Sequence, residues 1–273
     1  MIHDIAIHLT GSQEDAVRIA HAAALARLLD AHLTGLQVHR MPGPLAAVDP
    51  GGATWLEQAI AQSLVEAETI TERLRASLAA TGLNHELRRL DLFAGQAGEA
   101  LAREVRGSDM FLGSRPYGDP MREDWVEEAV LFKSGRPCLF VPPGQASASY
   151  GRIFIAWNNS REAARAVAEA IPLLVRATDV VVGIVEEDAS EAHGLRAGSD
   201  IGRYLSRHGV SADIRLINGW SDTGAALLNE AHQTGSDLVV MGAYGHSRMR
   251  EMLLGGATRH MLTLAELPVF VAH

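Results

Sequence analysis

Four glycines near the C-terminus stand in a pattern suited to holding an anion. The segment 241–260 reads MGAYGHSRMREMLLGGATRH, with Gly242 and Gly245 near its start and the pair Gly255 and Gly256 further on. Glycine is costly to order unless its backbone freedom is needed. The second pair directly precedes a predicted helix, whose free N–H groups and positive dipole end suit an anion. We therefore predict a phosphate site; the alternative is that the glycines serve tight turns and helix packing.

The elements around these glycines predict an open parallel sheet. Strand-like apolar runs lie at 152–157, 179–187, 212–217, 236–242 and 269–273, and helical segments lie at 161–174, 200–208, 223–235 and 257–267, the first of these capped by Ser160. Strands separated by helices imply parallel βαβ units with right-handed crossovers. Ligands of such sheets bind at the carboxyl ends of the strands, and Gly242 ends one of them.

The first half of the chain repeats this series. DIAIHLTGS matches RIFIAWNNS, GSDMFLG matches GSDLVVMG, and RPCLFVPPG matches LPVFVAH. The repeat predicts two tandem α/β domains, residues 1–147 and 148–273, joined near the small-residue segment 144–150. The first domain is the longer one, chiefly through a Pro- and Gly-marked loop and a helix predicted over about 55–80.

Composition excludes several classes of function. The net charge of -9 and the pI near 5.7 argue against nucleic acid and acidic membranes as partners. One cysteine, Cys138, allows no intrachain disulfide and indicates a reducing compartment. The start of the chain lacks the pattern of a signal peptide, and no apolar run reaches the length of a membrane helix, about 20 residues. A cytoplasmic protein is expected.

The spacing Gly242-x2-Gly245-x9-Gly255, followed by a small residue, resembles the nucleotide signature of the universal stress protein family. The resemblance implies two open five-stranded parallel-sheet domains, Rossmann-like with strand order 3-2-1-4-5, and ATP, with or without Mg²⁺, as the ligand. It implies a site in the C-terminal domain formed by Ala156, Asn158, Val185, Gly242, Gly245, Arg248, Gly255, Gly256, Ala257 and Thr258.

Four of these positions have particular roles or departures. Asn158 stands where the family usually has an Asp that contacts the ribose, and Asn still donates and accepts hydrogen bonds. Gly256 replaces the usual Ser or Thr, so a hydroxyl contact to phosphate is missing; Thr258 either supplies a substitute hydroxyl or packs its helix. Arg248 either approaches a phosphate or is a solvated cation.

The N-terminal domain departs further from the signature. After GSDMFLG the loop carries two prolines, with Gly113 and Gly118 at the wrong spacing and no glycine pair before a helix. Without a phosphate cradle, this half is predicted to be structural or to bind a partner.

Other residues that could do chemistry have plainer interpretations. The twelve histidines show no zinc-type spacing, so surface or capping positions are expected. Cys138 is predicted to be a buried hydrophobe and Trp157 a core residue, with Trp220 more exposed. Asp109 and Asp237 are predicted to satisfy N–H groups in turns.

The function predicted from these residues is nucleotide-dependent regulation. The chain lacks the Gly-x4-Gly-Lys-Ser/Thr loop, so strong ATP turnover is not expected. The resemblance implies a stress-response protein that binds ATP and contacts unidentified protein partners. The fifth strands, in CLFVPPG and VFVAH, are expected to pair within the chain as a pseudo-dimer that itself dimerises. The alternatives are a scaffold or carrier for a non-nucleotide metabolite or lipid-like ligand, and a slow ATP hydrolase.

Overall fold

A computed structural model describes residues 1–43, 52–117, 126–144, 149–185, 191–243 and 256–273. The N-terminal half contains, in chain order, β1 (Asp4–Leu9), α1 (Glu14–Leu29), β2 (His32–Arg40), α2 (Gly52–Ala79), β3 (His85–Leu92), α3 (Ala97–Val105), β4 (Met110–Ser114), α4 (Val126–Lys133) and β5 (Cys138–Val141). The C-terminal half contains β6 (Arg152–Ala156), α5 (Arg161–Leu174), β7 (Asp179–Val185), α6 (Glu191–Arg207), β8 (Asp213–Ile217), α7 (Thr223–Gln233), β9 (Leu238–Gly242), α8 (Gly256–Leu264) and β10 (Val269–Ala272).

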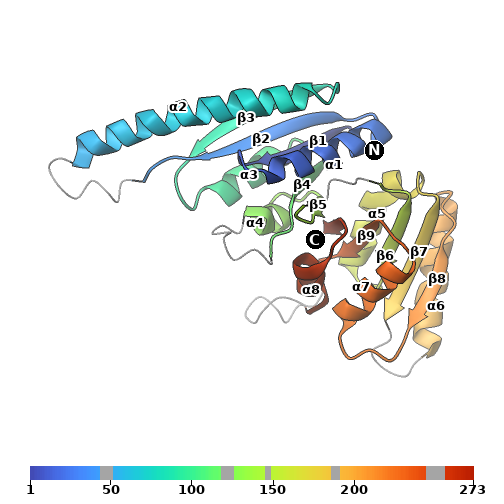
Figure 1. The fold of residues 1–273 in the computed structure, drawn as a ribbon. Coiled ribbons are helices and arrows are strands. Elements are labelled where there is room, and N and C mark those ends of the chain that lie inside the picture. The colour runs from blue at the N-terminus through green and yellow to red at the C-terminus, as the bar shows by residue number, and fades with distance from the viewer. Residues whose placement is uncertain (44–51, 118–125, 145–148, 186–190, 244–255) are drawn as a thin grey trace.

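The strands form one ten-stranded sheet in the order β3-β2-β1-β4-β5-β10-β9-β6-β7-β8. Each half has its own strands in the order 3-2-1-4-5, as predicted, and the halves meet at β5 and β10 (Figure 1). That central pair is antiparallel, with Phe270 opposite Leu139, whereas the neighbouring pairs β4–β5 and β9–β10 are parallel. The predicted pairing of the two fifth strands within one chain is therefore confirmed.

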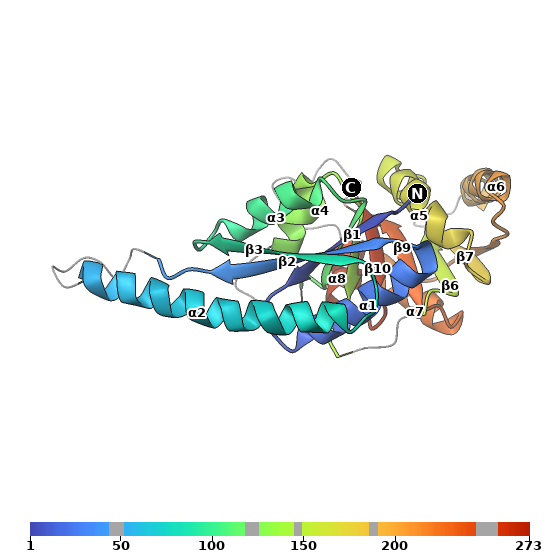
Figure 2. The ribbon, with the colours of Figure 1, turned by 90° about the horizontal axis from the view of Figure 1, so that it is seen from above.

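Helices cover both faces of the sheet. In the N-terminal half α1 and α2 lie on one face and α3 and α4 on the other (Figure 2). One apolar cluster joins side chains of α1, α2, α5 and α6 to one face, and a second joins those of α3, α4, α7 and α8 to the other. Each apolar layer therefore runs through both halves, and the site at the strand ends is supported from both sides.

Predicted local features hold the helices and first strands in place. Ser160 caps α5 by accepting the Ala163 N–H at 3.1 Å, as predicted. The Asp109 carboxylate accepts the N–H groups of His3 and Asp4, and Asp237 accepts those of Gly151 and Arg152. The two aspartates thus tie the first strand of each half to the turn before the fourth, as the prediction that they satisfy N–H groups expects.

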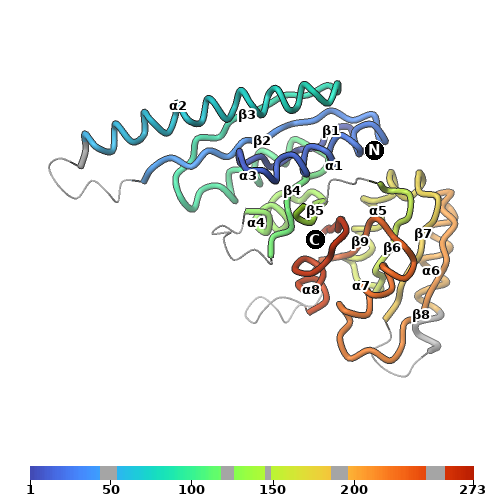
Figure 3. The backbone as a smooth tube through the Cα atoms, viewed as in Figure 1, coloured from blue at the N-terminus to red at the C-terminus, as the bar shows by residue number. Residues whose placement is uncertain are grey.

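The structure agrees with the predicted bounds of one long helix and differs for another. The predicted helix at 55–80 is α2, which lies along β2 and β3 (Figure 3). α6 begins at Glu191, earlier than the predicted 200. Gly198 lies in this earlier part of the helix and packs closely against the sheet, since a Cβ there would meet Ile214 at 2.8 Å. The predicted join at 144–150 falls partly on residues 145–148, outside the described residues.

Candidate functional site

The carboxyl ends of the central strands of the C-terminal half bring the predicted residues to one edge of the sheet. Ala156 ends β6 and lies opposite Gly183 of β7 and Met241 of β9. Val185 ends β7, and Gly242 ends β9. Parallel strands place these ends side by side, and an open α/β sheet binds its ligands at that edge.

Gly242 has a structural reason to be glycine. A Cβ at this position would meet the main-chain N of Ala163 at 2.4 Å and the carbonyl carbon of Glu162 at 2.5 Å. The first turn of α5 therefore lies directly on the end of β9, and its backbone leaves no space for a side chain. For this glycine the alternative of helix packing accounts for the residue type without a ligand.

Gly256 has different surroundings. It is the first residue of α8, one position earlier than predicted, and no atom of the described residues lies within 4 Å of a Cβ built on it. Its backbone does not need glycine either, since its φ is not positive. The first N–H groups of any helix have no partner within the helix, and such groups suit an anion.

The other predicted residues of α8 point inward. Ala257 is half-buried: its Cα lies 3.1 Å from a Cβ built on Gly224 of α7. Thr258 is 5% exposed, as the alternative that it packs its helix expects. Gly245, Arg248 and Gly255 lie outside the described residues, so their predicted contacts stay predictions.

The loop between β6 and α5 is shaped by its own polar groups. The Asn158 Oδ1 atom accepts the Ser160 N–H at 3.2 Å, and Asn159 adopts a left-handed conformation with φ +56°. Asn158 is exposed, so its side-chain NH₂ group faces outward as a donor. The carboxamide can thus contact a ligand hydroxyl while its oxygen holds the turn.

Trp157 joins this loop to the core. It is 8% exposed and packs in the same apolar cluster as Ala163 and Val167, which confirms the predicted core position. Its main-chain N–H donates to the Gly183 carbonyl at 2.9 Å. Its indole Nε1–H, however, is buried and has no hydrogen-bond partner within the described part of the chain. A buried donor without a partner is uncommon, and here it lies at the end of β6.

Negative charge already occupies the first turn of α5. Burial raises the pKa of the Glu162 carboxyl, but hydrogen bonds from Arg161 Nε and from the main chain outweigh it, and the pKa lies below its usual range. Glu162 is therefore a carboxylate beside the end of β9. Of the helices that follow β6 and β9, α8 is the one whose start suits a further anion.

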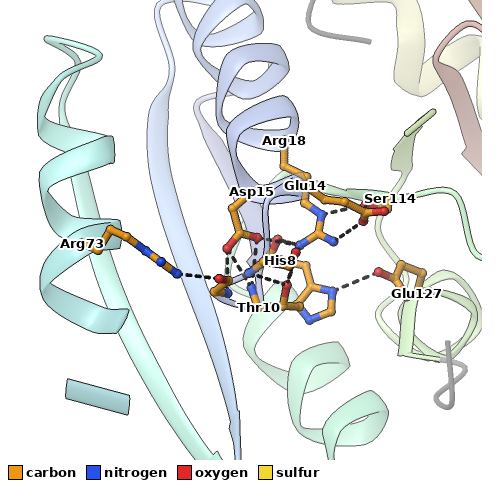
Figure 4. A network of polar contacts seen from close by, with 10 residues as sticks. His8, Thr10, Glu14, Asp15, Arg18, Arg73, Ser114 and Glu127 are labelled. Carbon is orange, nitrogen blue, oxygen red and sulfur yellow. Dashed lines mark hydrogen bonds and ion pairs between the residues drawn. The ribbon is translucent and has the colours of Figure 1, made fainter. Parts of the chain in front are cut away.

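The equivalent corner of the N-terminal half is filled by its own side chains (Figure 4). The Asp15 carboxylate accepts the N–H groups of Thr10 at 3.0 Å and Gly11 at 2.7 Å. Arg18, itself 3% exposed, donates to Asp15 at 2.7 Å and to the Ser114 hydroxyl at 2.7 Å. An internal carboxylate thus takes the amides that would otherwise face an anion.

Strand register explains the difference between the halves. Ile5 pairs with Met110 and Ile153 pairs with Leu238, so Ser114, one residue after Gly113, is the equivalent of Gly242. Asp15 corresponds in the same way to Ala163. The C-terminal half therefore lacks both side chains that complete the internal network. The predicted absence of a phosphate cradle in the N-terminal half concerns the loop after β4, of which residues 118–125 lie outside the described residues, so it stays a prediction.

The histidines depart from the surface positions expected of them. His8 is 5% exposed and its Nδ1 atom lies 3.0 Å from Glu127 Oε1. His21 is fully buried, with Nδ1 2.8 Å from the Tyr150 hydroxyl. Each Nδ1 atom has a partner more than 100 residues away in the chain, and no spacing in the sequence indicates such pairs.

α8 also contacts the N-terminal half. The Arg259 guanidinium lies over the Tyr117 ring at 5.3 Å, and Arg115 donates to the Ala265 carbonyl at 2.7 Å. A displacement of α8 would therefore change contacts between the halves.

The described residues contain neither a metal-binding cluster nor a membrane-spanning helix. No group of three or more His, Cys, Asp or Glu side chains there is arranged to hold a metal ion. No helix in those ranges has the length and hydropathy needed to cross a membrane.

Comparison with known proteins identifies relatives of both the sequence and the fold. The sequence profile of the Universal stress protein family matches residues 149–273. Universal stress protein Slr1230 of Synechocystis is 23% identical over 150 residues, covering 52% of this chain and 48% of that protein, so the match spans about half the length of this relative.

Two solved structures resemble the whole chain. A universal stress protein from Archaeoglobus fulgidus DSM 4304 has a TM-score of 0.76 at 16% identity, covering 98% of this chain and 97% of its own. A protein of unknown function from Pseudomonas aeruginosa PAO1 has a TM-score of 0.65 at 16% identity, covering 99% and 92%. These likenesses establish the fold of both halves.

Proposed function

Residues 149–273 belong to the universal stress protein family, and from that premise we propose that this half binds one adenine nucleotide, ATP in particular. The N-terminal half of the chain, residues 1–147 in this proposal, serves as a framework that carries the partner-contacting surface. The nucleotide acts as a regulatory ligand, and the chain turns it over slowly or not at all.

The observation that carries the proposal is the open first turn of α8 at Gly256. No described atom lies within 4 Å of a Cβ built on it, and the first N–H groups of a helix have no partner within the helix. In the N-terminal half an internal carboxylate, Asp15, accepts the amides of the β1–α1 loop, which corresponds to the β6–α5 loop of the C-terminal half. In this proposal the external anion binds in the C-terminal half, at the first turn of α8.

The neighbouring residues fit a nucleoside. Ala156, at the end of β6, has a small side chain at this edge. The Asn158 NH₂ group is an exposed donor for a ribose hydroxyl, and the Trp157 indole N–H is a donor without a partner in the described chain. In the proposal the triphosphate, with or without Mg²⁺, lies at Gly256 and in the loop that contains Gly245, Arg248 and Gly255.

Regulation follows from the contacts of α8. In the proposal this helix holds the phosphates at its first turn and touches Tyr117 and Arg115 of the N-terminal half further along. A ligand that binds one position of α8 better than another shifts the population toward it. Binding thereby changes the surface that both halves present to a protein partner or to a second copy of the chain.

The experiment is a calorimetric titration of ATP, ADP and AMP into the full chain and into Gly256→Glu. A carboxylate at the first position of a helix favours the helix dipole, so this variant keeps its fold, but it repels phosphate. Gly256→Ala is the matched control because it adds bulk without charge. We expect one ATP per chain for the wild type, weaker binding for Gly256→Ala and no detectable binding for Gly256→Glu. Equal binding by all three proteins would place the nucleotide elsewhere or rule the proposal out.

Native mass spectrometry separates this function from the alternatives. Protein purified without added nucleotide should carry a mass equal to ATP or ADP. A retained metabolite or lipid of another mass would instead support a carrier. Phosphate release that is equal for the wild type and Gly256→Glu would identify a contaminant and not a slow ATP hydrolase.

A further inference from the structure

Three polar side chains in the N-terminal half form a relay that the nucleotide proposal does not use. The His39 ring of β2 lies between Ser63 of α2 and Asp91 of β3: Nε2 is 2.7 Å from Ser63 Oγ, and Nδ1 is 2.8 Å from Asp91 Oδ1. An ionised carboxylate only accepts hydrogen bonds, so His39 Nδ1 carries the proton and Nε2 is an acceptor. The Ser63 hydroxyl therefore donates to His39.

The fold positions these groups firmly. His39 and Asp91 are register partners in the parallel pair β2–β3. Ser63 lies one turn before the buried Ala67 on the face of α2 that covers the sheet. The Asp91 carboxylate also forms an ion pair with Arg89, with 3.0 Å between Oδ1 and Nε, and the His39 side chain is 11% exposed. Ser63, His39 and Asp91 thus stand in the order of nucleophile, base and orienting carboxylate that activates a serine in hydrolases.

A cavity of about 270 Å³ adjoins the relay. His39 lines it together with Arg40, Gln37, Thr10 and His8 from the carboxyl ends of β1 and β2. Arg40 adds positive charge to the wall, where a developing oxyanion would be stabilised.

A second histidine in this cavity indicates that the occupant is polar. His8 Nδ1 donates to Glu127, so its Nε2 atom is an acceptor; it is buried and has no partner in the described ranges (Figure 4). A buried acceptor of this kind needs a donor from a ligand or from water. A short molecule with a hydroxyl or amide N–H meets that need.

The same helix shows what serines and threonines do there when they only support structure. Ser77 donates to the carbonyl of Arg73, one turn earlier, which is the usual bond of a helical serine. Gln37 of β2 is tied to α2 by two bonds: its Oε1 accepts from the Thr71 hydroxyl at 2.8 Å, and its Nε2 donates to the Ala67 carbonyl at 3.3 Å. Hydrogen bonds can therefore link α2 to the sheet without a histidine or a carboxylate. Ser63, in contrast, contacts a histidine that is itself hydrogen-bonded to a carboxylate.

We propose that Ser63, His39 and Asp91 form a hydrolytic site for short, polar acyl esters. Ser63 Oγ forms a bond to the carbonyl carbon of the ester while its proton passes to His39 Nε2. The bond from that carbon to the alcohol oxygen then breaks, and His39 returns the proton to the leaving oxygen. Water next gives a proton to His39, its oxygen bonds to the acyl carbon, and the carboxylic acid leaves as Ser63 regains its hydrogen.

Asp91 is the positioning residue of the site. It holds the ring of His39 in the tautomer that accepts from Ser63. Asp91→Asn should lower kcat by about 10²–10⁴-fold with little change in KM, because the orientation of the base matters in the transition state. A purely structural carboxylate would leave kcat and KM in the folded fraction unchanged.

The test uses the full chain with p-nitrophenyl acetate and with a fluorophosphonate probe mapped by mass spectrometry. Ser63 should be labelled, Ser63→Ala should lose both labelling and hydrolysis, and Ser77→Ala, the matched control on α2, should keep both. Circular dichroism verifies that Ser63→Ala is folded. If it is not, Ser63→Cys provides the second variant, and its thiol should react with iodoacetamide faster than that of Ser77→Cys.

Two results would overturn the proposal. The first is an unlabelled Ser63 in the intact protein. The second is hydrolysis by Ser63→Ala, or thiol reactivity of Ser63→Cys, at the rate of the matched Ser77 variant. The cavity adds a size criterion: p-nitrophenyl acetate and butyrate should be cleaved, while turnover of the palmitate ester at an equal rate would exclude this cavity as the acyl site. The outcome is independent of nucleotide binding, which involves the other half of the chain.

Discussion

The two glycines that the structure describes in the nucleotide motif should respond oppositely to the same change. In Gly242→Ala the new Cβ would lie 2.4 Å from Ala163 N, a shortfall of 1.0 Å against the 3.4 Å at which ordinary contact begins. The obstacle is the backbone of α5, so the first turn of that helix must move. Overpacking of this kind destabilises a protein by about 1–3 kcal/mol. Gly256→Ala adds a methyl group in open space at ordinary φ and should stabilise the fold by about 0.4–1 kcal/mol.

Urea unfolding followed by circular dichroism measures both variants against the wild type. The midpoint should fall for Gly242→Ala and rise slightly for Gly256→Ala, with the slope of the transition unchanged. If Gly242→Ala proved as stable as the wild type, α5 would not lie as close to β9 as described. If Gly256→Ala lost stability, Gly256 would be needed by the fold, and its openness would no longer indicate a ligand.

Three further predictions concern buried and capping groups. Arg18→Met leaves the Asp15 carboxylate buried without its ion pair, so the free energy of unfolding, measured in urea, should fall by about 3–5 kcal/mol. A fall of less than about 1 kcal/mol would show that the network contributes little to stability. Burial raises the pKa of the Cys138 thiol, so iodoacetamide should label it only in urea; rapid labelling of the native protein would contradict its burial in β5. The Ala225 N–H that caps α7 lowers the pKa of Asp222, so the stability this carboxylate contributes is present at neutral pH and is lost as the pH falls through its folded pKa. The free energy of unfolding of the wild type should therefore exceed that of Asp222→Asn, which keeps a neutral cap, by about 0.3–1 kcal/mol near pH 7, and the difference should vanish once Asp222 is protonated in the folded state; a pH-independent difference would show that titration of Asp222 is not its source.

Local signals in the sequence predicted most of the architecture. Alternating apolar runs and helical segments, repeated twice, identified the strands, and Ser160, Asp109 and Asp237 had roles that short-range chemistry sets. α6 was the exception at a boundary, since Gly198 weakened the helical pattern where the fold uses it for close packing against Ile214.

The site was less accessible to sequence reasoning because its important contacts are long-range. Arg18 reaches Ser114 across 96 positions, and His8 reaches Glu127 across 119, so no motif marks either pair. Gly242 and Gly256 have the same residue type in the same motif, and only the approach of α5 shows that the first is required by packing. His39 and Asp91 share a register that follows from the pairing of β2 with β3, which spacing alone does not reveal.

The central claim is that an external anion binds at the first turn of α8 and at no equivalent place in the N-terminal half. Isothermal titration of ATP into the full chain tests it most directly, with Gly256→Glu measured in parallel. The account predicts one site per chain for the wild type and no detectable heat of binding for a folded Gly256→Glu. Two sites per chain, or undiminished binding by Gly256→Glu, would contradict it.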